Sequence, residues 1–512
     1  MPPLHRITPE RAWPLHDRAA TQHLEAVVAA TLPSHTLMQR AGLAVARLAL
    51  ALAPHGQVFW IACGRGNNGG DGFEAALHLQ AWGKQPVLTW LGDEATSPAD
   101  ALASLARARA AGVAFADAPP SEYDLGVDAL LGLGFRAAGA GRTAGSSDAR
   151  LAHWLARLND GHAPLLNVDL PSGLDADTGN SAHFLIADKP ASTGAAGQFP
   201  LKNGTRHTLS LLTLKPGLFT ADGRDRAGQV WWDDLSSGAD KLPPTAWLGL
   251  EGSLDGGAAR AHGPHASHKG SYGDVAVIGG APGMTGAALL AGRAALHGGA
   301  GRVFVALLDG HGAGVDAQQP ELMYREADAL DFYALTVVCG CGGGDAVRGV
   351  LPRVLSTAAR LVLDADALNA IAADSALQTL LAARGRRGAA TVLTPHPLEA
   401  ARLLGSTTAA VQADRLGAAQ TLVQRFGSVV VLKGSGTVTA APDQLPVICA
   451  GGNARLATGG TGDVLAGLVG ALLAAGMPVR EAACSAVARH AGVADRWPDD
   501  RTLTAGALAS SL

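Results

Sequence analysis

The chain has 512 residues, of which 48% are hydrophobic and 16% charged, so it is long enough and apolar enough to bury several cores. The 66 glycines follow no three-residue period and long Glu/Lys-rich stretches are absent, which excludes collagen, coiled coil and intrinsic disorder. A net charge of −4 lacks the basic excess typical of proteins that bind nucleic acid or membrane surfaces. We therefore expect several globular domains with many tight loops, and neither a nucleic-acid nor a membrane partner.

No segment of the sequence is predicted to cross a membrane or to direct export. An uncharged run at residues 464–479 is broken by three glycines and a proline, and it is shorter than the roughly 20 apolar residues that a bilayer requires. The N-terminal residues 1–18 lack the apolar core of a signal peptide, and five scattered cysteines are too few for a disulfide framework. We therefore expect a cytoplasmic protein.

The first half of the chain alternates apolar runs typical of buried strands with Ala-rich runs typical of helices. The predicted strands are 57–63, 86–91, 125–130 and 164–169, and the predicted helices are 72–82, 97–111 and 148–159. Strands that alternate with helices predict a Rossmann-like, doubly wound parallel sheet. The first domain is placed at residues 1–240.

The second half repeats this alternation with different loops. Its predicted strands are 274–279, 302–307, 336–339, 360–364, 390–393 and 428–432. A stretch rich in Gly, Pro, Ser and His, roughly residues 236–267, separates the two halves and reads as a linker. The sequence thus predicts two α/β domains of different type, the second at residues 241–512.

A glycine-rich loop, GRGNNGGDG at residues 64–72, follows the first predicted strand. Gly64, Gly66 and Gly69 have the spacing of a dinucleotide fingerprint, in which glycines let the backbone approach a pyrophosphate at a helix N-terminus. Asp71 would compete with a phosphate for the positive helix end, which favours a pocket of amide and carboxylate oxygens around a cation and a polar ligand. Alternatively, residues 64–72 form a strand-to-helix turn that binds no ligand.

Two aspartates end other strands of the same half. Asp128 closes the apolar run that begins at residue 125, and Asp169 closes the run that begins at residue 164. Because ligands bind at the carboxyl ends of strands in open α/β sheets, we expect both aspartates and the glycine-rich loop to converge on one pocket. Each aspartate alone is equally typical of a turn.

Five motifs resemble those of NAD(P)H-hydrate epimerase domains. They are LMQRAG (37–42), GNNGGDG (66–72), DALLGLGF (128–135), VDLPSGLDADTG (168–179) and LKPGL (214–218), and the resemblance spans most of residues 10–235. It implies that Asp169 is catalytic and binds substrate, and that Asn68, Asp128 and Ser172 hold a potassium ion, a hard cation that prefers oxygen ligands. The remaining contacts that it implies to the hydrated dinucleotide come from Asn67, Asn68, Gly69, Gly70, Asp71, Gly132, Leu133, Gly134, Phe135 and Arg136.

A second constellation, NARLATGGTGD at residues 453–463, leads directly into the uncharged run 464–475. Backbone N–H groups of glycines at a helix N-terminus form an anion hole suited to a phosphoryl group, and Asp463 beside it can take a proton from an attacking hydroxyl. The motif therefore predicts phosphoryl transfer, with a purely structural glycine turn as the alternative.

Lys433 is one of seven lysines among 40 basic residues, and it follows the strand 428–432. A cation in a loop of Gly, Ser and Thr at a strand end suits nucleotide phosphates, whereas a solvated lysine at a turn is the alternative. His396 follows another strand between two prolines that restrict its backbone, which favours a pocket role over a structural one. Asp364 and Asp366 either hold a magnesium ion or form a turn.

These loops resemble the ADP-dependent dehydratase half of bifunctional NAD(P)H-hydrate repair enzymes, which has a ribokinase-like fold. The matching segments, within roughly residues 265–510, are HKGSYGDVAVIGG (268–280), LDADALNA (363–370), TPHPLEAARLL (394–404), LKGSGT (432–437) and NARLATGGTGDVLAG (453–467). The family more usually has GPGLG where residues 340–344 read GCGGG. The resemblance implies that Asp463 is the catalytic base, that Ala287, Gly342, His396 and Asp463 contact the hydrate, and that Lys433, Gly434, Ser435, Gly436, Thr437 and Gly462 bind ADP or AMP.

As a whole the resemblance implies repair of hydrated NADH and NADPH. The first domain would interconvert the R and S hydrates, and the second would use ADP to dehydrate the S hydrate, releasing NAD(P)H, AMP and phosphate. K⁺ in the first domain, ADP as co-substrate and Mg²⁺ are the expected cofactors, and a homo-oligomer is expected.

Three other functions fit part of the sequence. A ribokinase-type small-molecule kinase fused to a dinucleotide-binding domain explains GGTGD but leaves GNNGGDG and VDLPSG without a role. A nicotinamide-dependent dehydrogenase would use the first glycine-rich loop. A non-catalytic interaction protein, like those resembling the first domain that bind apolipoprotein, would require both pockets to be inactive.

Overall fold

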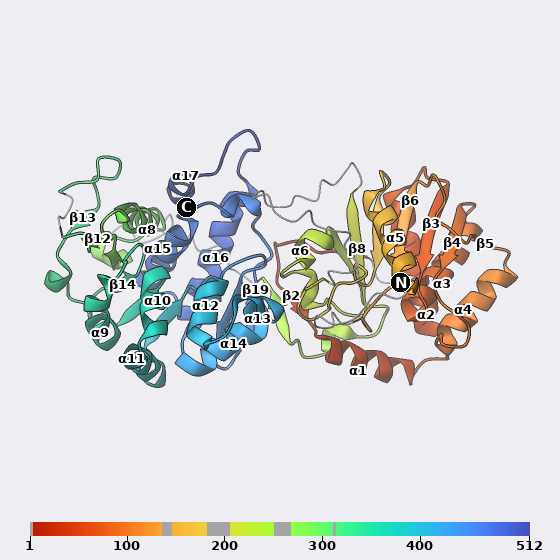
Figure 1. The fold of residues 1–512 in the computed structure, drawn as a ribbon, viewed down its shortest axis with the longest axis horizontal. Coiled ribbons are helices and arrows are strands. Elements are labelled where there is room, and N and C mark those ends of the chain that lie inside the picture. The colour runs from red at the N-terminus through yellow and green to blue at the C-terminus, as the bar shows by residue number, and fades with distance from the viewer. Residues whose placement is uncertain (1–3, 136–145, 182–204, 250–267, 311–313) are drawn as a thin grey trace. The chain divides into compact units, whose positions relative to one another are not determined.

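The computed structural model describes residues 4–135, 146–181, 205–249, 268–310 and 314–512, which fall into two compact units (Figure 1). The first unit comprises Met1–Thr8 and Pro14–Thr245, and the second comprises Pro9–Trp13 and Ala246–Leu512. A short piece of the N-terminal segment therefore belongs to the second unit, which the sequence pattern does not predict. Arg136 lies outside the described residues.

The first unit is built on an eight-stranded sheet with the order β1-β9-β8-β7-β6-β3-β4-β5. All neighbouring strands are parallel except β1 with β9, which agrees with the predicted parallel sheet. The strands are β1 (His5–Arg6), β3 (Val58–Cys63), β4 (Gln85–Trp90), β5 (Ala114–Phe115), β6 (Leu125–Ala129), β7 (Leu165–Val168), β8 (Arg206–Leu211) and β9 (Gln229–Asp233).

Helices cover both faces of this sheet because successive side chains of a strand point to opposite faces. Phe59 and Ile61 of β3 belong to a core shared with α2, α3 and α4, whereas Trp60 packs with Trp154 of α5. The helices are α1 (Arg18–Ala29), α2 (Thr36–Leu52), α3 (Asn67–Ala81), α4 (Ala99–Ala110), α5 (Ser146–Asp160) and α6 (Gly223–Arg226). The unit is therefore doubly wound, as predicted.

The second unit contains an eleven-stranded sheet with the order β13-β12-β11-β14-β15-β16-β17-β18-β19-β10-β2. Strands from β13 to β17 are parallel, and β18 pairs antiparallel with both β17 and β19. The strands are β2 (Trp13–Leu15), β10 (Ala246–Leu248), β11 (Asp274–Gly279), β12 (Arg302–Leu307), β13 (Met323–Tyr324), β14 (Thr336–Cys339), β15 (Arg360–Leu363), β16 (Ala390–Leu393), β17 (Val429–Leu432), β18 (Val438–Ala441) and β19 (Gln444–Ile448).

All six strands predicted for this half are present, but the predicted linker 236–267 is not unstructured throughout. It contains β10, in which Trp247 pairs with Val447 of β19 in parallel register. Three residues are too few to show an alternating pattern, so this strand could not be recognised from the sequence.

Two helical layers enclose the second sheet (Figure 1). Val275 and Val277 face a core with α8, α15 and α16, whereas Ala276 and Ile278 face a core with the helices of the other layer. The helices are α8 (Thr285–His297), α9 (Val347–Thr357), α10 (Ala365–Ala373), α11 (Ser375–Arg386), α12 (Pro397–Leu404), α13 (Thr408–Ala413), α14 (Arg415–Phe426), α15 (Thr461–Ala474), α16 (Val479–Asp495) and α17 (Ala505–Ser510).

Both signature helices begin earlier than the sequence pattern predicts. α3 begins at Asn67 rather than at residue 72, and α15 begins at Thr461 rather than at residue 464. The polar motifs thus form the first turns of these helices, where backbone N–H groups have no partner within the helix. Each motif therefore presents backbone donors as well as side chains.

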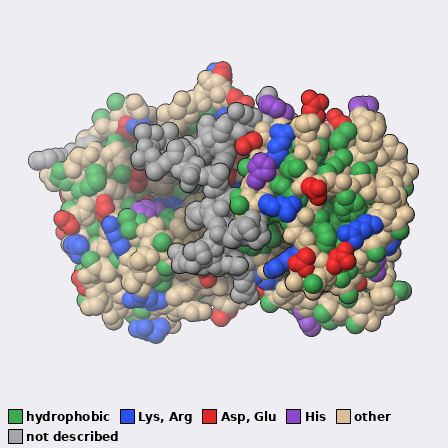
Figure 2. Space-filling view, turned by 45° about the vertical axis from the view of Figure 1, so that its right-hand side comes forward, with side chains coloured by type: hydrophobic (Ala, Val, Ile, Leu, Met, Phe, Trp, Pro, Cys, Tyr) green, Lys and Arg blue, Asp and Glu red, His purple; other side chains and the backbone are tan. Residues whose placement is uncertain are grey.

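None of the helices among the described residues is long and apolar enough to cross a membrane. On the face drawn in Figure 2, basic and acidic side chains are intermingled at the right rather than gathered by sign. This distribution agrees with the small net charge of −4.

Candidate functional site

The first candidate site lies where the strand order of the first sheet reverses. From β3 the sheet continues to β4 on one side and to β6 on the other, and the loops that follow β3 and β6 meet at this switch point, where open α/β sheets bind ligands. Gly64, at the end of β3, donates its N–H to the Ala129 carbonyl over 3.0 Å. A Cβ on Gly64 would lie 1.8 Å from the Leu130 carbonyl oxygen, so only glycine lets the two loops meet.

Asp128 and Ser172, predicted as cation ligands, lie in direct contact. The Ser172 backbone N–H and hydroxyl donate to the two carboxylate oxygens of Asp128 over 3.0 and 2.6 Å. Burial raises the pKa of Asp128, and the Ser172 donors partly oppose that shift. A cation beside this carboxylate would favour its charged form, because opposite charges stabilise ionisation.

Asn68 completes the predicted potassium ligands and fits that role. It lies in the first turn of α3 with its side-chain amide against Gly132, four residues beyond Asp128. Its Nδ2 is buried without a hydrogen-bond partner among the described residues, and exchanging the amide N and O would place an oxygen there. The donor set of amide, carboxylate and hydroxyl oxygens suits a hard monovalent cation.

Asp169 forms a buried ion pair with Lys215 at the end of β7. Lys215 is 0% exposed and also donates to the Leu211 carbonyl over 2.6 Å and to the Ser210 hydroxyl over 3.3 Å. The Leu211 N–H donates to Asp169 Oδ1 over 3.1 Å. Asp169 has φ 65°, a left-handed conformation that Asp tolerates better than most residues. The predicted catalytic carboxylate is therefore held in one orientation by an internal cation.

Two further carboxylates surround this ion pair. Burial and then the Asp169 charge raise the pKa of Asp71 well above its usual range, and the same two causes raise the pKa of Glu25 in α1. Lys215 and Glu25 were not predicted as site residues. Lys215 carried a signal, because it is a rare lysine within the LKPGL motif, whereas nothing around Glu25 distinguished it from a solvated helix residue.

The remaining described residues predicted for this site belong to the segments that follow β3 and β6. Asn67 is exposed at the start of α3, and Gly69 and Gly70 are buried in its first turn. Leu133 and Gly134 lie at the surface side of the second loop, and Phe135 packs against the cluster that contains Trp154.

The second candidate site lies at the carboxyl ends of β14, β15 and β17. Lys433 Nζ is 2.7 Å from Asp364 Oδ1 and 4.0 Å from Glu399 Oε2. The Thr394 hydroxyl also donates to Asp364 Oδ1 over 2.7 Å. Gly462 lies in the first turn of α15, and a Cβ added to it would be 3.3 Å from Lys433 Nζ. The lysine thus lies beside the backbone of the GGTGD turn, and we call Lys433 and this turn the phosphate cradle.

Asp463 lies beside this cradle with a pKa raised to about 7, first by burial and then by the Asp364 charge. A carboxylate with a pKa near 7 is a base matched to neutral pH. A pKa near 7 suits a proton acceptor, the role predicted for Asp463.

His396 caps α12 instead of standing free in the pocket. Its Nδ1 accepts the N–H groups of Leu398 and Glu399 over 3.1 and 3.3 Å, so the ring proton resides on Nε2, which lies 3.2 Å from Glu399 Oε1. Burial raises the pKa of Glu399 to about 7. Glu399 stands three residues after His396, the spacing of a capping box at the start of a helix. This spacing could have predicted the capping role of His396.

Arg415 is hydrogen-bonded to the nucleotide-binding loop predicted at Lys433–Thr437. This buried side chain donates to the carbonyls of Leu432, Lys433 and Gly436 over 3.2–3.5 Å. Burial lowers the pKa of Arg415 to about 10. Its guanidinium therefore fixes the loop from the inside, and the Thr437 hydroxyl adds a hydrogen bond to the Gly434 carbonyl over 3.2 Å.

Two family models match the chain, and together they cover most of it. A model described as YjeF-related protein N-terminus matches residues 34–217, and a model described as NAD(P)H-hydrate dehydratase matches residues 275–512. The bifunctional NAD(P)H-hydrate repair enzyme Nnr of Escherichia coli is 37% identical over 98% of this chain and 93% of its own length. The chain belongs to the family of bifunctional NAD(P)H-hydrate repair enzymes.

Single-domain relatives match the second half. An ADP-dependent (S)-NAD(P)H-hydrate dehydratase of Neisseria meningitidis is 46% identical over 48% of this chain and 84% of its own length. A solved ADP/ATP-dependent NAD(P)H-hydrate dehydratase of Bacillus subtilis, crystallised with ATP and Mg²⁺, is 30% identical over 49% of this chain and 91% of that one, with a TM-score of 0.42.

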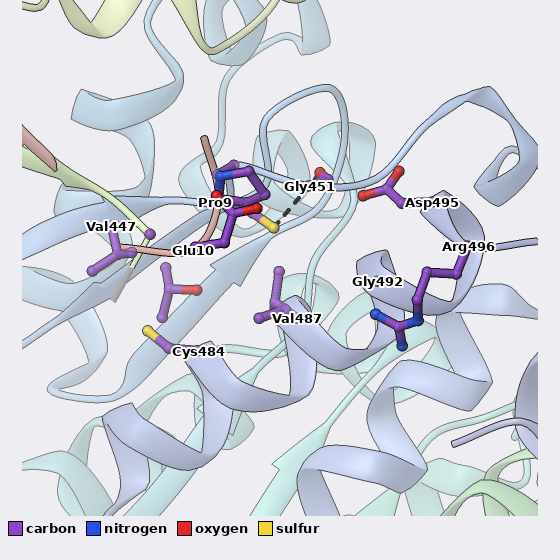
Figure 3. Close-up of a pocket in the computed structure, with 14 residues that line it drawn as sticks. Pro9, Glu10, Val447, Gly451, Cys484, Val487, Gly492, Asp495 and Arg496 are labelled. Atoms are coloured by element: carbon purple, nitrogen blue, oxygen red, sulfur yellow. Dashed lines mark hydrogen bonds between the residues drawn. The ribbon is translucent and has the colours of Figure 1, made fainter. Parts of the chain in front are cut away.

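In this repair enzyme the second unit also contains a cavity of about 270 Å³ (Figure 3). Cys484 and Val487 of α16 line one side of it and Pro9 and Glu10 line another. Cys449 lines it too, and its N–H donates to the carbonyl of Thr437 in the nucleotide-binding loop over 2.9 Å. One residue of the cavity wall is therefore hydrogen-bonded to the predicted nucleotide-binding loop, and no residue of the lining was predicted.

Gly342 and Ala287, both predicted to contact the hydrate, are neighbours. Gly342 has φ 59°, and its Cβ position lies 2.7 Å from the Met284 carbonyl oxygen and 2.9 Å from Ala287 Cβ. The two residues therefore form one surface in which a side chain on residue 342 has no room.

Gly342→Ala is expected to lower the free energy of unfolding of the second unit by about 1–3 kcal/mol, because it adds left-handed strain and displaces α8. It should also raise KM for the hydrate more than KM for ADP. Denaturant unfolding and steady-state kinetics measure these effects. Gly349→Ala is the matched control, because no atom lies within 4 Å of its Cβ position and helix α9 favours Ala. Equal losses in both variants would contradict the expectation.

Proposed function

We propose that this chain repairs hydrated NADH and NADPH with two separate active sites. The first unit interconverts the R and S hydrates, and the second uses ADP to dehydrate the S hydrate, releasing NAD(P)H, AMP and phosphate. The observation that carries the proposal is the pairing, in one chain, of a buried Asp169–Lys215 site with an Asp463 base beside a Lys433 phosphate cradle. A homo-oligomer is part of the proposal and is measured by light scattering.

In the dehydratase site, Asp463 removes the proton from the hydroxyl on C6 of the reduced nicotinamide ring. The freed oxygen attacks the β-phosphorus of ADP, and the bond from phosphorus to the AMP oxygen breaks. The ring nitrogen lone pair then expels phosphate with the electrons of the C–O bond, and loss of a C5 proton restores the dihydropyridine. Lys433 and the N–H groups of Gly460–Gly462 stabilise the charge on the transferring phosphoryl group.

The nucleotide base fits the cavity beside the Lys433–Thr437 loop. The cavity is lined mainly by apolar atoms of β18, β19 and α16, which suits a flat aromatic ring, and Cys449 in its wall is hydrogen-bonded to Thr437 of the predicted nucleotide-binding loop. Mg²⁺ bound with ADP would neutralise phosphate charge during phosphoryl transfer, and Asp366 is the carboxylate that would hold the ion.

In the epimerase site, Asp169 and Lys215 supply an acid to the C6 hydroxyl. Protonation lets water leave as the ring nitrogen lone pair forms a planar iminium. Water then adds to the other face and releases one proton, which restores the acid overall and leaves C6 inverted. Asn68, Asp128 and Ser172 would hold K⁺ beside the substrate, where it supplies a fixed positive charge to polar groups of the dinucleotide.

The experiment that tests the proposed function gives purified chain the separated R or S hydrate with ADP or with ATP and follows recovery of reduced cofactor by its absorbance. Recovery from both hydrates with ADP is expected. No recovery with either nucleotide contradicts the dehydratase, and recovery from S but never from R contradicts only the epimerase. Accumulation of a stable phosphorylated product would instead favour the ribokinase-type kinase.

The pH dependence of dehydration should report Asp463. Because the base must be ionised and its pKa is about 7, kcat/KM for the S hydrate should rise with pH to a plateau, with its midpoint near 7. Rates across roughly pH 5–9 measure this. Glu399 has a similar pKa of about 7, so Glu399→Gln is the control: the midpoint should persist in that variant. Its disappearance would assign the titration to Glu399 instead.

A further inference from the structure

The phosphate cradle contains a thiol that the proposed reaction does not use. Cys341 is 0% exposed in the GCGGG loop after β14, and its Sγ lies 3.9 Å from Asp364 Oδ2. The Cys341 sulfur and one carboxylate oxygen from each of Asp364 and Asp463 all lie within 4.8 Å of one another. Two loops and the first turn of α15 therefore bring one sulfur and two carboxylate oxygens close together.

The separation of Cys341 and Asp364 is close to that of two ligands in a tetrahedral metal site. With metal–sulfur and metal–oxygen bonds of about 2.3 and 2.0 Å, two ligands of Zn²⁺ lie about 3.5 Å apart. The distance of 3.9 Å from Cys341 to Asp364 needs a change of only a few tenths of an ångström. Lys433 and Thr394 both hold Oδ1 of Asp364, so the other oxygen, Oδ2, is the one directed to Cys341.

The charges also balance. A thiolate and the carboxylates of Asp364 and Asp463 carry three negative charges, which Zn²⁺ together with the Lys433 ammonium would neutralise. Without a metal, burial and both aspartates raise the pKa of the Cys341 thiol well above its usual range. Binding must therefore release the thiol proton to solvent as the sulfur–metal bond forms, and affinity should increase with pH.

We propose that Cys341, Asp364 and Asp463 form an inhibitory site for a thiophilic divalent cation such as Zn²⁺. The bound ion takes the lone pairs of Asp463, so the residue can no longer accept the hydroxyl proton. Mg²⁺ does not compete at the sulfur because it is a hard ion that prefers oxygen ligands. Metal binding stands independently of the proposed function, whereas the inhibition rests on it.

Binding is tested on the full chain with Co²⁺, which substitutes for Zn²⁺ and gives a sulfur-to-cobalt charge-transfer band in the near ultraviolet. The wild type should show the band, Zn²⁺ should displace it, and Cys341→Ala should lose it. Cys339→Ala is the matched control, because Cys339 is equally buried two residues away but its sulfur is not part of the cluster. Absence of the band in the wild type, or its persistence in Cys341→Ala, overturns the site.

Inhibition is tested by titrating Zn²⁺ into the ADP-dependent reaction with excess Mg²⁺ present. The concentration for half-inhibition should rise at least about tenfold in Cys341→Ala and stay unchanged in Cys339→Ala. Equal inhibition of all three proteins would overturn the inhibitory role. If no protein dehydrates the hydrate at all, the proposed function fails while the cobalt spectrum still decides whether the metal site exists.

Discussion

Asp463→Asn is expected to lower kcat of ADP-dependent dehydration by roughly 10²–10⁴-fold, the usual contribution of a general base. Asn keeps the shape of the side chain but cannot accept the hydroxyl proton, and it removes the group whose pKa is raised to about 7. KM for ADP should change little, because Lys433 and the GGTGD backbone remain in place. Steady-state rates with the purified S hydrate measure the effect.

The other active site of the same molecule provides the control for this variant. Interconversion of R and S hydrates, followed by chromatography, should proceed at the wild-type rate in Asp463→Asn. Full ADP-dependent turnover in the variant would show that Asp463 is not the base. A parallel loss of epimerisation would point to misfolding of the chain instead.

Asp169→Asn is expected to lower the epimerisation rate by roughly 10²–10⁴-fold through loss of the acid–base carboxylate. Asn is the appropriate replacement because, like Asp, it tolerates the left-handed backbone that residue 169 adopts at φ 65°. With ADP present, the S hydrate should still be repaired at the normal rate, whereas recovery from the R hydrate should fall to the rate of spontaneous epimerisation.

Lys215→Met tests whether the lysine holds the Asp169 carboxylate in place. Removing the buried lysine leaves the Asp169 carboxylate without its cation, which should cost about 3–5 kcal/mol of stability in the first unit in addition to epimerase activity. Urea unfolding followed by tryptophan fluorescence measures that loss. Wild-type epimerisation in either variant would contradict the role given to the Asp169–Lys215 pair.

The sheets and the polar strand ends were predictable because both follow from local pattern. Buried parallel strands such as Val58–Cys63 and Asp274–Gly279 are short apolar runs bounded by glycines. Most of the predicted site residues follow the ends of such strands. The sequence assigns Asp128 and Ser172 to one cation site, and the fold brings them into contact. The resemblance to a known family contributed their pairing, since 44 residues separate them in the chain.

What could not be predicted depends on tertiary contacts rather than on local pattern. Glu25 and Arg415 look like ordinary helix residues in the sequence, and only packing shows that one lies beside Asp169 and the other supports the nucleotide-binding loop. The capping role of His396 required the position of the Leu398 N–H. The starts of α3 and α15 were placed too late because glycines usually disfavour a helix, whereas here they form its first turn.

The place of Pro9–Trp13 in the second unit has a consequence for how the protein is made. β2 occupies one edge of a sheet whose adjacent strand, β10, is translated only after the whole first unit. During synthesis the beginning of the chain must therefore wait, without its sheet partner, until residues near the middle leave the ribosome, and the second sheet closes late. Dividing the gene at the apparent linker would therefore remove Pro9 and Glu10, and with them part of the cavity wall, from the second unit.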